Sequence, residues 1–191
     1  MVFGHFSSRS FHSRLPRRET KQRGRIASRR LHFEALEDRR VLSTFTVTNV
    51  NDSGPGSLRQ ALTNAETTVN VGGVPDEIHF NIPGSEVHTL HPKSSLPLIR
   101  DPVIIDGYSQ PGARPNALAI GDDALLKIEI NGSRLPAGTN LFNFSGDYST
   151  VRGLAITEVP YYCFGLGYFG VAANNNKIVG NFIGTDSAGV T

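Results

Sequence analysis

The sequence predicts an all-β body behind a basic leader, and three observations lead to this fold class. Short apolar runs recur between residues 77 and 184, each ended by Gly, Asn, Asp or Pro. Helical periodicity is missing between these runs. Similar segments are separated by 24 and 27 residues. Strands without intervening helices form either an antiparallel sandwich or a stacked parallel solenoid, and the spacing favours the solenoid.

Residues 1–43 are predicted to be a disordered basic leader. This segment holds 11 Lys and Arg residues against 4 acidic ones, a net charge of +7, and shows no sustained hydrophobic period. The remaining 148 residues hold 8 basic and 13 acidic residues, a net charge of −5. The basic character therefore belongs to the leader. Nucleic-acid binding by this leader is a third candidate function, but nucleic acid is not the expected partner.

Residues 44–75 are predicted to form one strand followed by a capping helix. The run TFTVTNV alternates apolar and polar residues as a half-buried strand does, and NDSGPGS then supplies turn residues. Ser57 and Gln60 have the spacing of a helix capping box. The apolar residues after the cap fall on one helical face: Leu58, Ala61, Leu62 and Ala65.

Residues 76–191 carry the repeated strands. Residues 151–156 align with residues 178–183 at an offset of 27, and each copy has a Gly after its first apolar step, Gly153 and Gly180. Such a Gly permits the positive φ of a tight bend, and we expect Asn181 to stack on an Asn of the neighbouring layer. The predicted runs are 77–82, 102–107, 125–132, 140–146, 150–156 and 177–184.

Two stretches of the sequence resemble known proteins. LEDRRVLS at 36–43 has Leu36, Glu37, Arg39 and Leu42 at the positions of a Leu-Glu-Pro-Arg-x-Leu-Leu motif, with Asp38 in place of Pro, and so resembles the start of very large exported proteins of planctomycete-type bacteria. FTVTNVNDSGPGSLRQAL at 45–62, followed by DEIHF at 76–80, resembles the opening segment of a family of bacterial surface β-helix proteins.

This resemblance implies a right-handed parallel β-helix, a pectate-lyase-like solenoid, with the Ser57 helix capping its N-terminal end. It also implies a cell-surface or secreted location, with the leader engaging the export machinery. Polysaccharides or other surface proteins are the partners expected of such a module, whose role is structural or adhesive. No catalytic mechanism is implied, and because residues 76–191 stop in mid-pattern, we expect the coils to be truncated at the C-terminus.

A polysaccharide-active lyase or hydrolase is the alternative function. Such an enzyme would need clustered carboxylates for calcium, with Arg152 or Lys127 as the base that removes a sugar proton. The calcium candidates are Asp106, Asp122 and Asp123, together with Asp147 and Asp186. Because most of these acids sit beside Gly or Ser, where Asp commonly stabilises turns, no cofactor is predicted.

Other candidate groups have ordinary structural explanations. His79, His88 and His91 lie close in sequence, but solvent-facing histidines beside a strand are commoner than a zinc site. Cys163 is the only cysteine and is expected to be a buried, inert thiol. The aromatic residues of 161–169 are expected to stack in the core rather than form a sugar platform. The sequence has no apolar run long enough for a transmembrane segment.

Overall fold

The computed structural model describes Met1, residues 43–167 and residues 170–189. The chain divides into two units, Met1–Glu37 and Asp38–Thr191, and the elements below belong to the second. The export motif residues Leu36, Glu37, Arg39 and Leu42 lie outside the described residues.

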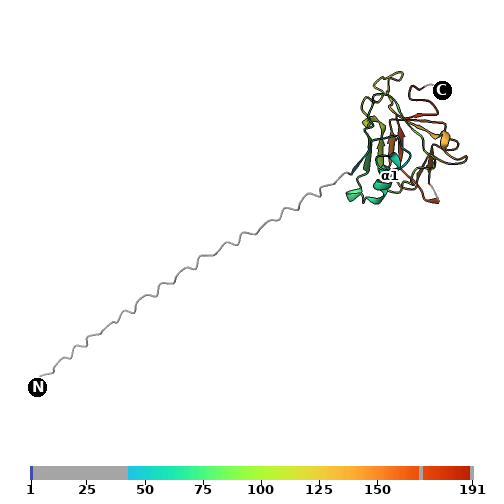
Figure 1. The fold of residues 1–191 in the computed structure, drawn as a ribbon. Coiled ribbons are helices and arrows are strands. Elements are labelled where there is room, and N and C mark those ends of the chain that lie inside the picture. Colours follow the sequence, from blue (N-terminus) through green and yellow to red (C-terminus); the bar gives the residue numbers. More distant parts are fainter. Residues whose placement is uncertain (2–42, 168–169, 190–191) are drawn as a thin grey trace. The chain divides into compact units, whose positions relative to one another are not determined.

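The second unit is built mainly from short strands, which Figure 1 shows running side by side. In chain order the elements are β1 (Thr44–Val47), α1 (Leu58–Thr67), η1 (Val71–Gly73), β2 (Asp76–Phe80), β3 (His88–Leu90), β4 (Val103–Asp106), η2 (Gly107–Ser109), β5 (Ile128–Asn131), η3 (Gly132–Arg134), β6 (Phe142–Phe144), β7 (Thr150–Arg152), β8 (Leu154–Thr157), β9 (Phe164–Leu166), β10 (Lys177–Val179) and β11 (Phe182–Ile183).

Helix α1 begins at the predicted cap. Ser57 is extended, and its Oγ accepts a hydrogen bond from Gln60 N at 3.2 Å, as an N-cap does. The Gln60 side chain does not return the bond, because Ser57 N donates to Gly54 O at 3.2 Å instead. Leu58 and Leu62 are buried on the face that contacts β1 and β2, and full burial of each Leu contributes about 1.5–3 kcal/mol.

The strands form three separate sheets, and all pairings between named strands are parallel. The first sheet has the order β1-β2-β4-β7-β10, the second β11-β8-β5-β3, and the third pairs β6 with β9. The alignment at an offset of 27 is confirmed by the strand register, since Ile178 pairs with Val151 and Ile183 pairs with Ile156.

The strand register places similar apolar residues on top of one another in the core. Ile78, Ile105 and Val151 occupy successive partner positions of the first sheet, and all three are buried. In the third sheet Phe142 and Phe164 are partners whose rings stack at 5.4 Å between centroids. Each added strand therefore extends a continuous apolar interior, the main stabilising contribution of such packing.

The predicted fold class, an all-β right-handed parallel β-helix, is wrong. The described part of the chain is a mixed α/β fold with one α-helix and eleven strands in three parallel sheets of five, four and two strands, and it does not close into a solenoid. The third sheet has only the strands β6 and β9, against five and four strands in the other two sheets. Apolar runs predict where strands form, but they do not specify how many strands each sheet receives.

Two finer expectations are also corrected. The 24-residue spacing from Ile104 to Ile128 is not a repeat, because Ile104 lies in the first sheet and Ile128 in the second. Asn181 does not stack on another Asn. Its Oδ1 accepts from Leu154 N at 3.0 Å and its Nδ2 donates to Val151 O at 2.9 Å, so it pairs main-chain groups at the bend between β7 and β8.

Candidate functional site

A column of side chains crosses the first sheet at one register position. His79, Asp106, Arg152 and Val179 are successive partners on β2, β4, β7 and β10. Their chain neighbours on the other side of the strands, such as Ile105 and Val151, belong to the buried core. Because side chains alternate along a strand, the column faces away from that core.

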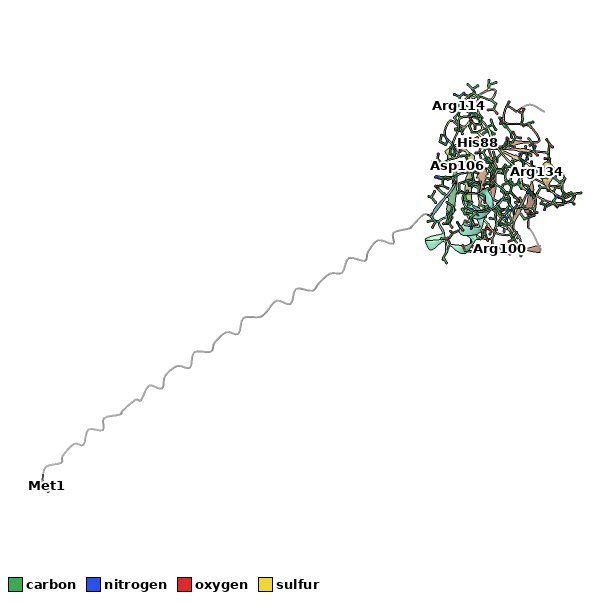
Figure 2. The ribbon with its side chains drawn as sticks, in the orientation of Figure 1. Met1, His88, Arg100, Asp106, Arg114 and Arg134 are labelled. Atoms are coloured by element: carbon green, nitrogen blue, oxygen red, sulfur yellow. The ribbon has the colours of Figure 1, made fainter. Side chains whose placement is uncertain are left out.

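An ion pair lies at the centre of this column. Arg152 Nη2 donates to Asp106 Oδ2 at 2.8 Å, and the two side chains are 46% and 12% exposed. Asp106 is therefore held under the guanidinium, while Arg152 remains accessible to a molecule in solution. Figure 2 shows Asp106 on the same side of the body as Arg114, with Arg134 on the opposite side.

Tyr108 is fixed beside the ion pair at both ends. Its main-chain N donates to Asp106 Oδ1 at 3.0 Å, and its hydroxyl donates to Gly180 O at 2.7 Å. Both repeat glycines make room for it: a Cβ on Gly153 would lie 2.9 Å from the ring Cγ, and one on Gly180 would lie 2.5 Å from the hydroxyl. The glycines shared by the two repeat copies therefore also accommodate this one tyrosine.

The loop between η2 and β5 forms the other wall and is braced by its own polar groups. Asn116 Oδ1 accepts from Leu118 N at 2.9 Å and from Asp123 N at 3.2 Å. Asp123 Oδ1 accepts from Ala117 N at 2.7 Å. Asp122 Oδ1 accepts from Ala124 N at 2.7 Å. These bonds hold the loop in one conformation, as Asx turns commonly do.

Together these elements enclose a pocket of about 370 Å³, which is within the usual range for small-molecule sites. The loop, η2, β7 and the turn from β10 to β11 all contribute to it. Its lining residues are Tyr108, Pro115, Asn116, Asp122, Ala124, Arg152, Val179, Gly180, Asn181 and Phe182.

The pKa values of two lining residues, Tyr108 and Arg152, are raised further above neutral pH. Burial raises the pKa of Tyr108, with the nearby carboxylates of Asp122 and Asp106 adding to the effect. The hydrogen bond from Arg152 to Asp106 raises the pKa of the guanidinium. Tyr108 and Arg152 therefore keep their protons at neutral pH, whereas a general base requires a pKa near the working pH.

The predicted calcium candidates have different partners in the structure. Asp106 pairs with Arg152, Asp122 lines the pocket, and Asp123 lies 3.5 Å from Arg114 Nη2. Within the described ranges, no group of three or more His, Cys, Asp or Glu side chains is placed to hold a metal ion.

The remaining enzymatic candidates lie outside the pocket. Lys127 Nζ donates to Ser85 O at 2.7 Å. Asp147 Oδ1 accepts from Asn174 N, and Asp186 Oδ1 accepts from Ala188 N at 2.9 Å. Of the acids and bases named for the alternative enzyme, the structure brings together only Asp106, Asp122 and Arg152.

The histidines and the cysteine do not form a common site. His79 lies in the first sheet, 2.8 Å from Glu77 Oε2, whereas His88 lies buried in the second sheet. Cys163 is half-buried against the core, and burial raises the pKa of its thiol, which lowers its reactivity.

The predicted core stacking of the aromatic residues in 161–169 is confirmed for Phe164 and is wrong for Tyr161 and Tyr162. Phe164 stacks on Phe142, whereas Tyr161 and Tyr162 are both more than half exposed, with ring centroids 4.1 Å apart. Residues 168–169 lie outside the described residues.

Sequence reasoning missed Tyr108 and Phe182 as site residues. Tyr108 follows the predicted strand 102–107 by one residue, in a stretch where Pro and Gly indicate a turn. The available signal for both residues was an aromatic side chain at a strand end beside a repeated glycine. The contact between Tyr108 and Gly180 could not be predicted, because the two residues are far apart in the sequence.

The chain matches no protein-family model, no curated protein and no solved structure. In the part of the chain that the structure describes, no helix has the length and apolar character needed to cross a membrane.

Proposed function

We propose that this chain is a structural and adhesive module of a cell-surface or secreted protein from a planctomycete-type bacterium. Its leader, with the motif at 36–43, directs export, and its body presents a binding surface to polysaccharides or other surface proteins. The resemblance of the leader and of residues 45–62 supports the location.

The state of the pocket groups supports binding rather than catalysis. Arg152 is paired with Asp106, and the pKa values of both Arg152 and Tyr108 lie above their ordinary values. A lyase that works in this pocket would need Arg152 as its base, because Lys127 lies outside the pocket. A guanidinium whose pKa is raised does not give up its proton near neutral pH. This observation carries the preference for an adhesive role over a lyase.

A sedimentation assay tests the adhesive role. The purified full chain is mixed with intact bacterial cells or with insoluble cell-wall polysaccharide, and the bound fraction and any released sugar are measured. We expect saturable retention without release of soluble sugar. Calcium-dependent release would support the lyase instead, and the absence of retention on every surface would overturn the adhesive proposal.

A second experiment tests the location. The full chain and a chain lacking residues 1–43 are produced in a planctomycete host, and surface, medium and cytoplasmic fractions are compared. We expect the full chain outside the cytoplasm and the shortened chain inside it. Equal distribution of the two would show that the leader does not direct export.

A further inference from the structure

We infer that the Tyr108–Arg152 pocket binds a neutral sugar ring through two adjacent hydroxyl groups. This inference rests on the proposed adhesive function and names its ligand class. It comes from the hydrogen-bonding capacity that the pocket leaves unused, from its net charge and from the apolar groups in its wall.

Most polar groups of the pocket are already occupied by the protein. Asn116 and Asn181 use both their amide oxygen and their amide nitrogen in bonds to the main chain. The Tyr108 hydroxyl donates its proton to Gly180 O. These groups shape the pocket, and they leave little capacity for a ligand.

Two lining residues keep unused hydrogen-bonding capacity, Asp122 as an acceptor and Arg152 as a donor. Asp122 spends Oδ1 on Ala124 N, which leaves Oδ2 as an acceptor. Arg152 spends one donor on Asp106, although a guanidinium carries five N–H groups. A hydroxyl group both donates and accepts, so one hydroxyl can donate to Asp122 while its neighbour accepts from Arg152. Adjacent hydroxyls on a sugar ring offer this pair of functions.

The charge of the pocket selects against anionic sugars. Asp122 lines the pocket, and Asp106 forms an ion pair with the lining residue Arg152, so two negative charges stand against one positive charge. A uronate or phosphate would meet a guanidinium that is already paired and a carboxylate that repels it. A neutral sugar avoids both the repulsion and the cost of burying its own charge.

The wall of the pocket supplies apolar contact area for the ring. Tyr108, Pro115 and Phe182 all line it, and Val179 is about half exposed there. Aromatic and apolar side chains pack against the C–H groups of a sugar ring, while the polar pair fixes its orientation.

Binding of a defined sugar panel tests this inference. The purified full chain is titrated by calorimetry with neutral, uronate-containing and amino-sugar oligosaccharides at low and high salt. We expect binding of a neutral oligosaccharide whose affinity changes little with salt. Preference for a charged sugar, or affinity that falls steeply with salt, would overturn the inference.

Matched variants assign the binding to this pocket. Asp122→Asn keeps the acceptor for Ala124 N and removes the charge, and Asp147→Asn makes the same change outside the pocket. Because a hydrogen bond to a charged group is stronger than one to a neutral group, we expect Asp122→Asn to raise the Kd about tenfold or more. We expect Asp147→Asn to leave the Kd unchanged, and circular dichroism checks that both variants fold.

The outcomes separate this inference from the adhesive proposal. Equal affinity of Asp122→Asn and the wild type would place the sugar elsewhere and overturn the inference. Retention on cells without binding of any panel sugar would also overturn it, while the adhesive proposal would stand. Loss of both retention and sugar binding would overturn the two together.

Discussion

Replacement of Gly153 by Ala tests how the repeat glycines and Tyr108 fit together. Gly153 has a φ of +73°, and a Cβ there would lie 2.6 Å from Tyr108 N and 2.9 Å from its ring Cγ. Gly138 offers a matched control, because its φ is +74° and nothing lies within 4 Å of its Cβ position. The two substitutions therefore share the backbone cost and differ in the steric one.

The expected magnitudes follow from these two sites. A left-handed conformation costs a non-glycine residue about 1–2 kcal/mol, and Ala recovers about 0.4–1 kcal/mol by restricting the unfolded chain. Gly138→Ala should thus lower the free energy of unfolding by about 1 kcal/mol. Gly153→Ala adds overpacking against Tyr108, about 1–3 kcal/mol more, for a total of about 2–4 kcal/mol.

Urea denaturation of the full chain measures both effects. The chain has no Trp, so unfolding is followed by far-ultraviolet circular dichroism and by tyrosine fluorescence. We expect the midpoint to fall further for Gly153→Ala than for Gly138→Ala at an unchanged slope. If the two variants lose equal stability, Tyr108 does not pack against Gly153 as described, and the account of the shared glycine is refuted.

Four further substitutions test the helix cap, the bend and the buried acid. Ser57→Ala removes the acceptor for Gln60 N and should cost about 1 kcal/mol of stability, whereas Gln60→Ala should cost less. Thermal unfolding measures both losses. Equal losses would contradict a cap in which only the Ser57 side chain takes part. Asn181→Ala leaves Leu154 N without its partner and should cost about 1–3 kcal/mol in urea, a neutral effect being the contrary result. Burial raises the pKa of Asp76, so stability should fall as the pH rises from the ordinary to the raised pKa, and Asp76→Asn should flatten that fall. A variant pH profile that matches the wild type would show that Asp76 does not contribute to it.

Local features of the chain were predictable from the sequence because each depends on nearby residues. Alternation in 44–50 identifies β1, and the Ser57 spacing identifies the start of α1. The offset of 27 residues identifies the register between β7 and β10, because two copies of one pattern bury the same residues when they pair. Strands β3 and β9 were missed, since each has only three residues and no clear alternation.

The tertiary structure alone decided the fold class and the pocket. Sheet membership depends on which distant strands pair, so Ile104 and Ile128 have the same local pattern but belong to different sheets. The pocket brings together Tyr108, Asp122 and Arg152 with a turn more than 70 residues after Tyr108, at Gly180. Hydrophobic periodicity shows which face of a single segment is buried. Contacts between distant segments, such as those of the sheets and the pocket, are set by packing between segments.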